Sequence, residues 1–272
     1  SLITPVILLV LYATFLAKVY RDSFASAVPQ GFELDSSLID ATVGGQLISS
    51  LLAVCCITVA FCSNMLMVQD KVTGALRDIT VTPVKRSTLA VSYYIATVLS
   101  TMLICLIATG AGFIYLAKAG WYLSAADTAL FVLDVILLVL FGTALSSIIN
   151  FFLSSQGQMS AVGTIVSAGY GFICGAYMPI SQFGETLQHV ISFLPGTYGT
   201  SLLRNHALAG VYQEMADTGF PSEVIEAIKD SVDCNLYFFD SKVETGTMYL
   251  ILAGSTAVLI GIYIVMNLLK RH

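Results

Sequence analysis

Charged residues are scarce in this 272-residue chain. Lys, Arg, Asp and Glu together supply 11% of the residues, whereas hydrophobic residues supply 57%. An average soluble domain is about one-quarter charged, so this composition excludes an ordinary soluble protein and indicates that the lipid bilayer is the main solvent. The net charge of -5 decides little by itself, because acidic and basic residues gather in different segments.

The chain also lacks the residue patterns of an enzyme. It has no G-x-x-x-x-G-K-[ST] loop to hold nucleotide phosphates, so ATP hydrolysis by this chain is not expected. His189 and His206 lie outside the uncharged runs, with no evident nucleophile or paired metal ligands beside them. Cys55 and Cys62 share a helical face without a His or carboxylate, which favours apolar packing over a metal or redox site. We therefore expect no catalytic residue, metal or cofactor bound by this chain.

Long uncharged runs dominate what the sequence does contain. A membrane-spanning helix needs about 20 consecutive apolar residues, and the chain has room for about six such helices with connecting loops. We predict spans at 2–20, 42–68, 88–116, 128–152, 157–178 and 247–269. The expected fold is an all-α membrane protein with one transmembrane domain over residues 1–272.

Basic residues predict which span ends face the cytoplasm. They follow the second and the sixth span: Lys71, Arg77, Lys85, Arg86, Lys270 and Arg271. The positive-inside rule places these segments, and therefore both termini, in the cytoplasm. The stretch 211–246 is rich in Asp and Glu and is predicted to be an external acidic loop. Ala25, Ser26 and Ala27 imitate a secretory cleavage site, but the preceding run is long for a signal peptide.

The predicted cytoplasmic segment at about 69–83 has the pattern of a short amphipathic helix. Its apolar positions Val68, Val72, Leu76 and Ile79 recur at helical spacing. Gly74 falls in the middle of this predicted helix, where it would permit close approach by another backbone, and Pro83 ends it. Periodicity leaves two interpretations open: the helix docks into a partner's groove, or it lies on lipid head groups.

The stretch from Gly74 to Arg86 reads G-A-L-R-D-I-T-V-T-P-V-K-R and resembles the cytoplasmic signature of ABC-2 type permeases. These are the membrane subunits of a large class of ATP-driven exporters, and they typically show Gly-Thr-Leu-Glu followed by Thr-Pro or Ser-Pro and a base. Ala75 and Arg77 depart from that pattern, and Arg77 reverses a charge. The resemblance implies that the following residues couple the chain to an ATPase: Asp70, Lys71, Gly74, Leu76, Arg77, Ile79, Thr82, Pro83 and Arg86.

The resemblance also implies an export complex in a prokaryotic plasma membrane. Two cytoplasmic ABC ATPase subunits would supply ATP and Mg binding, and a second permease half, identical or related, would complete the assembly. Walls with few fixed charges favour a hydrophobic or amphipathic cargo such as a drug, an antimicrobial peptide or a lipid. Export of a lipid-linked polysaccharide is the alternative. The family commonly has an interfacial helix before the first span, so we expect further residues before Ser1; no nucleic-acid partner is expected.

The family further implies a re-entrant helical hairpin between the fifth and sixth spans, and the stretch 179–200 suits it. Pro179 is predicted to end the fifth span, and Pro195 and Gly196 to break the chain again. The helical run between them is too short to cross a bilayer. The alternative for this run is an interfacial external helix.

Small and polar residues within the runs are the remaining candidates. Gly163, Ser167, Gly171 and Gly175 recur every four residues, which predicts a helix interface, either in a dimer or within one subunit. Polar residues that could line a transport pathway are Gln46, Asn64 and Asp134. Asp134 lies about two turns from Asp127, so we expect it at the wet end of its helix, with a substrate or proton contact as the alternative.

Two other classes of membrane protein are disfavoured. A six-span cation channel would carry a carbonyl filter resembling T-V-G-Y-G, or repeated arginines in its fourth span. This sequence has no such filter after the predicted re-entrant run at 179–200 and no arginine in the predicted fourth span at 128–152. A noncatalytic scaffold remains open from sequence and would be distinguished by the absence of an ATPase partner or transport.

Overall fold

The computed structural model describes residues 36–81, 84–239 and 241–269, and the predicted first span at 2–20 lies outside them. In chain order the elements are α3 (Ser36–Thr73), α4 (Ala75–Thr80), α5 (Arg86–Ala119), α6 (Ala125–Phe152), α7 (Gln156–Ile173), η2 (Ile180–Gln182), α8 (Glu185–Ile191), α9 (Pro195–Asp217), α10 (Ser222–Ser231), β1 (Leu236–Phe238), β2 (Ser241–Val243) and α11 (Thr245–Leu269). Four of these helices, α3, α5, α6 and α11, are long and apolar enough to cross a membrane. The architecture is that of an all-α membrane protein.

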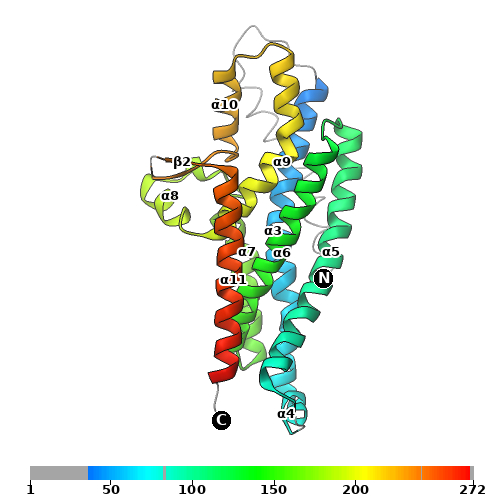
Figure 1. Ribbon diagram of the computed structural model, residues 1–272, viewed down its shortest axis with the longest axis vertical. Helices are drawn as coiled ribbons and strands as arrows, with labels where there is room; N and C mark the ends of the chain where they lie inside the picture. Colours follow the sequence, from blue (N-terminus) through cyan, green and yellow to red (C-terminus); the bar gives the residue numbers. More distant parts are fainter. Residues whose placement is uncertain (1–35, 82–83, 240, 270–272) are drawn as a thin grey trace.

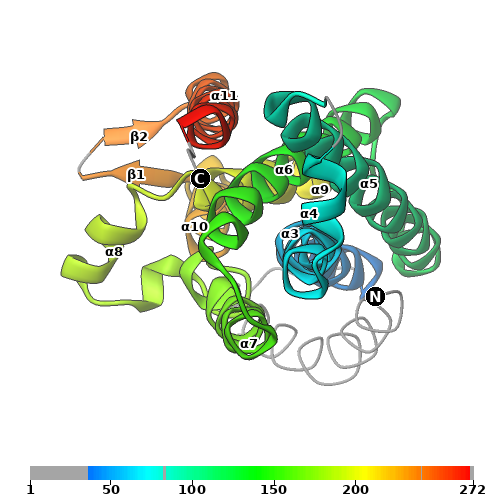
Figure 2. The same cartoon turned by 90° about the horizontal axis from the view of Figure 1, so that it is seen from below.

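Helix α3 forms the core of the bundle. Its 38 residues give a length of about 57 Å, well beyond the roughly 30 Å of a bilayer's hydrocarbon core. It packs against α5, α6, α7 and α9, which surround it in the view along the bundle (Figure 2). Because neighbours cover it on several sides, its residues from Ala41 to Phe61 are buried all round rather than along one stripe.

Local signals in the sequence set the ends of α6 and α5. Ser124 caps α6: its hydroxyl accepts from the Asp127 backbone N–H at 3.1 Å, and the Asp127 carboxylate accepts from the Ser124 N–H at 3.1 Å. This reciprocal pair satisfies N–H groups that the first turn leaves without helical partners. Helix α5 ends before Gly120, whose φ of +144° suits a residue without a side chain.

Helix α7 ends earlier than the predicted fifth span at 157–178. It stops at Ile173, and a glycine turn reverses the chain. Gly175 has φ +73° and its N–H donates to the Phe172 carbonyl at 3.2 Å, while the Ala176 N–H donates to the Gly171 carbonyl at 2.9 Å. These two bonds form a Schellman motif, which uses glycine in the left-handed conformation to end a helix. The 18-residue α7 is not among the four candidate spans.

Helix α9 is the main departure from the predicted fold. The sequence suggested a break at Pro195 and Gly196 and a loop from residue 211, yet residues 195–217 form one helix of 23 residues. Pro195 occupies the first helical position, where its missing N–H costs nothing and its fixed φ favours the helix. Helix α9 packs against α3, α6 and α11. Its polar residues interrupt the apolar run in the sequence, so the run did not predict a helix here.

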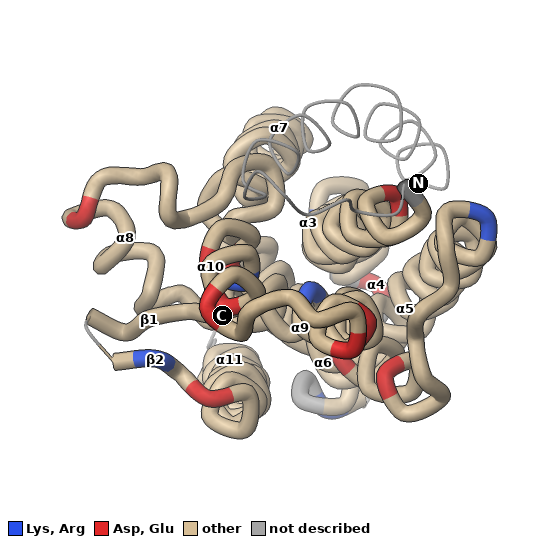
Figure 3. Tube along the Cα trace, turned by 90° about the horizontal axis from the view of Figure 1, so that it is seen from above, with Lys and Arg blue, Asp and Glu red and all other residues tan. Residues whose placement is uncertain are grey.

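The predicted acidic loop at 211–246 is folded rather than irregular. It contains the end of α9, helix α10 and an antiparallel hairpin in which Leu236 pairs with Val243. Seen from above, acidic positions mark α9, α10 and the segment that enters α11 (Figure 3). Helix α8 lies opposite the hairpin, to one side of the bundle (Figure 2). These elements form a small folded region around the start of α11.

Candidate functional site

The α3–α4 junction contains the residues predicted to couple the chain to an ATPase. The predicted single helix over 69–83 is wrong: α3 ends at Thr73, Gly74 has φ +88°, and a separate α4 follows. No atom lies within 4 Å of a side chain added at Gly74, so glycine is needed there for its backbone conformation and not for close packing. Helix α4 lies at the same end of the molecule as the C-terminal end of α11 (Figure 1).

Two of the predicted coupling residues tie α3 to its neighbours. The Tyr93 hydroxyl of α5 donates to the Asp70 carboxylate at 2.6 Å. The Lys71 amine donates to the backbone carbonyls of Asn150 at 3.0 Å and Phe151 at 2.9 Å. Carbonyls at a helix C-terminus lack intrahelical partners and carry partial negative charge, so an ammonium group stabilises them. The ends of α3, α5 and α6 are therefore joined beside α4.

The structure describes only some of the remaining coupling candidates. Leu76 is half-buried on α4, and Asp78 and Val81 are exposed. Thr82 and Pro83 lie outside the described residues, and the side chains of Arg77, Ile79 and Arg86 are not described. The structure therefore presents α4 as a short helix at the tip of α3, with exposed polar and apolar groups available to a partner.

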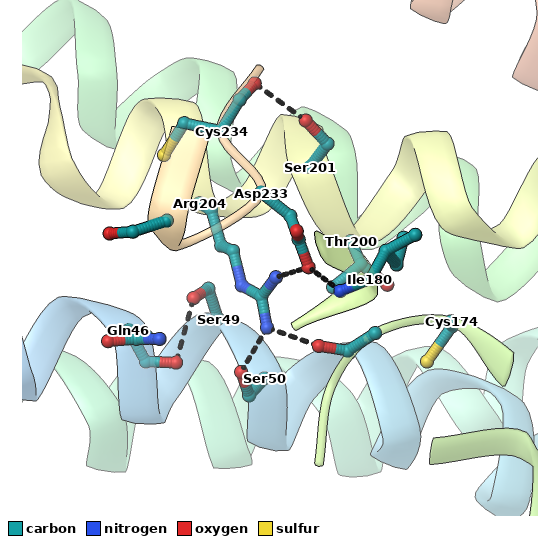
Figure 4. Close-up of polar contacts among 12 residues, drawn as sticks. Gln46, Ser49, Ser50, Cys174, Ile180, Thr200, Ser201, Arg204, Asp233 and Cys234 are labelled. Carbon is teal, nitrogen blue, oxygen red and sulfur yellow. Dashed lines mark hydrogen bonds and ion pairs between the residues drawn. The ribbon is translucent and has the colours of Figure 1, made fainter. Parts of the chain in front are cut away.

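A buried arginine joins α9 to three other segments (Figure 4). Arg204 is 0% exposed. Its guanidinium donates to the Asp233 carboxylate at 3.0 Å, to the Ser50 hydroxyl of α3 at 3.0 Å and to the Gly175 carbonyl at 2.5 Å. The Ile180 N–H also donates to the Asp233 carboxylate, at 2.8 Å. A buried charge is tolerated only when it is paired and hydrogen-bonded, and these contacts meet that condition.

A second buried cluster joins α6, α9 and α11. Asp134 is 0% exposed, so its carboxylate is enclosed by protein and is not open to water as expected. Its carboxylate contacts the His206 Nδ1 at 2.6 Å and accepts from the Tyr249 hydroxyl at 2.5 Å. The cluster forms because α9, which the sequence analysis left outside the spans, places His206 against α6.

The other two pathway candidates lie on α3. Asn64 is buried, and its side-chain amide donates to the hydroxyls of Ser146 at 3.1 Å and Ser147 at 2.8 Å on α6. Gln46 is buried one turn from Ser50, on the part of α3 that faces the Arg204 cluster (Figure 4). Asn64 thus acts as a polar contact between helices, as is common where side-chain amides lie at membrane depth.

Comparison with known proteins places this arrangement in a family. Residues 4–269 match the family described as ABC-2 family transporter protein. The chain belongs to the ABC-2 transporter family. No curated protein shows detectable similarity to it. Membership identifies the chain as a transport component of a membrane, and in this family that component associates with an ABC ATPase.

The four small residues predicted to form an interface in this ABC-2 protein do not share one contact among the described residues. A side chain added at Gly163 would approach Met65 of α3 to 2.8 Å, whereas one added at Gly171 would overlap the Tyr177 ring. Ser167 is exposed. Gly175 lies beyond the end of α7 and serves the turn described above. Of these four residues, only Gly163 lies against another long helix, α3.

The predicted breaks lie at element boundaries of the ABC-2 fold. Pro179 precedes η2, and Pro195 and Gly196 begin α9. Gly196 permits close packing, since a side chain there would overlap the Tyr170 hydroxyl of α7. Between these positions, η2 and α8 form two short helices. The chain does turn twice in this region, and the second turn leads into a long helix.

Sequence reasoning missed Arg204, Asp233 and Tyr249 as members of buried polar clusters. One signal was available for Arg204: apolar residues surround it at Leu202, Leu203 and Leu208, so a helix through this position would bury it. Nothing local identifies Asp233 as its partner, because 29 positions separate the two residues.

Proposed function

We propose that the chain is the membrane subunit of an ATP-driven exporter that moves a hydrophobic or amphipathic compound out of the cell. A separate cytoplasmic ATPase would power it through α4 and the adjoining end of α3. The observation that carries this proposal is the left-handed Gly74, which detaches α4 from α3 at one end of the bundle, within a chain that belongs to the ABC-2 family. A short helix held in this way can enter a partner's groove.

Helix α3 supports a route for coupling. It runs without interruption from α4 to Ser50 and beyond, and Ser50 accepts from Arg204 of α9 at 3.0 Å. The contacts of Asp70 and Lys71 join its α4 end to α5 and α6. Displacement of α4 by an ATPase would therefore move three helix ends together and would reach α9 through α3.

The orientation follows from charge. Lys71 and Lys85 lie near α4, and basic residues favour the cytoplasmic side. Helix α10, which carries Glu223, Glu226 and Asp230, lies at the other end of the molecule (Figure 1). In this proposal α4 and the C-terminal end of α11 are cytoplasmic in a prokaryotic plasma membrane, and the complex contains two ATPase subunits and a second permease half.

The charged residues buried inside the helix bundle bear on which cargo the protein could carry. The buried charged side chains described within the bundle already have partners: Arg204 is paired with Asp233, and Asp134 contacts His206 and Tyr249. Groups satisfied in this way offer little to a small ion or a sugar, so an apolar or amphipathic cargo is favoured.

The test is ATP hydrolysis in proteoliposomes that contain this chain and the ATPase encoded nearest to it. A panel of hydrophobic drugs, cationic peptides and lipids is compared with no addition. Stimulation by one of them is expected. If the chains copurify but only a lipid-linked glycan stimulates hydrolysis, the cargo is a polysaccharide precursor. If the chains do not associate, the exporter proposal fails.

A further inference from the structure

A cavity lies where α8 and η2 face the segment from α10 to β1. Its volume is about 220 Å³, smaller than the roughly 300–1,000 Å³ typical of pockets for drug-sized ligands. Ile191, Leu236 and the ring of Tyr198 provide apolar surface, while Gln188 and Asn235 provide polar groups. The size and mixed lining suit a small polar group with an apolar attachment.

The charged groups that line the cavity are carboxylates. Asp233 is paired with Arg204 at 3.0 Å, whereas Asp230 accepts only from neutral donors: the Asn235 amide at 2.7 Å and the Tyr237 hydroxyl at 3.1 Å. The two nearby lysines both donate to Glu226, each at 2.9 Å. Among the described residues, no lysine or arginine donates to Asp230, although Lys242 lies close enough to interact with its charge.

An exposed aromatic patch directly follows two residues that line the cavity, Ser192 and Tyr237, along the chain. It consists of Phe193, which follows α8, and Phe238 and Phe239 of the hairpin. Phe193 is 63% exposed and Phe239 49%, and the Phe193 ring packs edge-on against Phe238 with centroids 5.2 Å apart. In a membrane protein, exposed aromatic side chains of this kind suit contact with lipid.

The position of this patch relative to the membrane follows from the short connection between β2 and α11. Strand β2 ends at Val243, and the candidate span α11 begins at Thr245. The hairpin must therefore lie at the membrane boundary, close to the N-terminal end of α11. Aromatic side chains concentrate at this level in membrane proteins, because it is apolar on one side and wet on the other.

We infer that the cavity binds the ammonium headgroup of an aminophospholipid from the leaflet at the N-terminal end of α11. The ammonium group lies against Asp230 and the Tyr237 ring, since a cation is attracted both to a carboxylate and to an aromatic face. The acyl chains leave across the patch of Phe193, Phe238 and Phe239. This inference depends on the membrane location of α11 and not on transport.

Lipid retention tests the inference. The purified full chain is delipidated in detergent and equilibrated with equal amounts of phosphatidylethanolamine, phosphatidylcholine and phosphatidylglycerol, and the retained lipids are counted by native mass spectrometry. We expect phosphatidylethanolamine to be retained about tenfold over the others, the lower end of the effect expected for one hydrogen bond to a charged group. Asp230→Asn should abolish this preference. The matched control Asp217→Asn removes an exposed carboxylate on α9, outside the cavity, and should leave it unchanged.

A second pair of measurements separates a lipid from a soluble amine. Combined Phe193→Ser and Phe238→Ser should lower phosphatidylethanolamine retention, and free ethanolamine should displace the lipid poorly. If ethanolamine displaces it fully and the double variant retains lipid normally, a soluble amine is the occupant and the lipid inference is overturned. Equal retention of all three lipids also overturns it. If Asp230→Asn does not fold, Gln188→Trp, which narrows the cavity from α8, must show the same loss of preference.

Discussion

Arg204 shows how a charged residue can occupy the centre of a membrane bundle. Its guanidinium reaches Asp233, Ser50 and the Gly175 carbonyl, so one side chain connects α9, α3 and two turns. The planar group offers several donors in fixed directions, which a lysine does not. The residue thereby secures the position of a helix that carries too many polar groups to be recognised as a span.

Replacing this arginine by an apolar residue should be costly. Arg204→Met leaves Asp233 buried without its cation, and the expected loss is about 3–5 kcal/mol of unfolding free energy. Thermal unfolding in detergent measures it. Adding Asp233→Asn removes the unpaired charge and should restore about half of the loss. Equal destabilisation in the single and double variants would mean that the ion pair is not the relevant interaction.

Glu226 makes the folded region of α10 and the hairpin sensitive to acid. Its hydrogen bonds with Lys229 and Lys242 lower the pKa of its carboxyl from 4.5 to about 2. Because the folded pKa is depressed, the stabilisation is fully present above pH 4.5 and is lost as the pH falls through about 2. The carboxylate is 46% exposed, so the effect should be at most about 1 kcal/mol. Unfolding of Glu226→Gln across this pH range should lack that loss, whereas Glu223→Gln should retain it.

The junction of α3 and α4 sets the direction of α4 relative to α3. A continuous amphipathic helix would extend α3 by three more turns, but the left-handed Gly74 turns the chain instead. The contacts of Asp70 and Lys71 fix the end of α3, so the change of direction occurs at a defined place. Because the end of α3 is fixed and α4 is a separate short helix, a displacement of α4 would be passed on to α3.

Substitution of Gly74 tests whether glycine is needed there for its left-handed backbone conformation or for its small size. Gly74→Ala should cost about 1–2 kcal/mol, because an L-residue is strained in the left-handed region, and it should reduce stimulated ATP hydrolysis. Gly110→Ala is the control, since no atom lies within 4 Å there either and its φ is not positive. Normal coupling in Gly74→Ala would show that the direction of α4 is unimportant for transport.

Close packing of α9 can be tested in the same manner. A side chain added at Gly210 would overlap the Tyr122 backbone oxygen in the connection between α5 and α6. Gly210→Ala should therefore destabilise the protein by about 1–3 kcal/mol. Gly169→Ala on α7 meets no atom within 4 Å, and it should be neutral or slightly stabilising in thermal unfolding. A harmless Gly210→Ala would argue against the position of α9 in the bundle.

The described part of the molecule has polar clusters within a largely apolar interior, and its long helices carry apolar side chains on their outer faces. Exposed large side chains such as Leu99, Leu103 and Leu250 cover the outer faces of α5 and α11, where lipid can surround them. The polar clusters of Asn64, Asp134 and Arg204 lie between helices. Such a distribution holds the bundle together where apolar contacts alone give little preference for protein over lipid.

The proposed orientation predicts opposite accessibility for the two ends. Asp78→Cys on α4 should react with a membrane-impermeant thiol reagent only from the cytoplasmic side, and Glu223→Cys on α10 only from outside. The native chain serves as the control, because five of the six cysteines are buried. Labelling of both positions from one side would reject this orientation.

Hydrophobic runs determined much of this protein directly. The predicted runs 42–68, 88–116, 128–152 and 247–269 became α3, α5, α6 and α11, because burial in lipid is a property of about 20 consecutive residues and needs no distant partner. Asn64 and Asp134 were noticed as polar residues inside such runs, but Asp134 was expected at the wet end of its helix, and a role for either in a transport pathway stays a prediction. The short pattern around Gly74 indicated the family, which the match over residues 4–269 confirmed.

Tertiary contacts decided the rest. Helix α9 could not be recognised locally, since Arg204 and His206 read as surface residues until their partners are known. Those partners lie 29 to 154 positions away for Arg204 and 72 positions away for His206. A buried polar group is acceptable only when another group satisfies it, and sequence order does not show which groups meet. Only the fold shows which groups pair, and it shows that residues 195–217 form the helix α9.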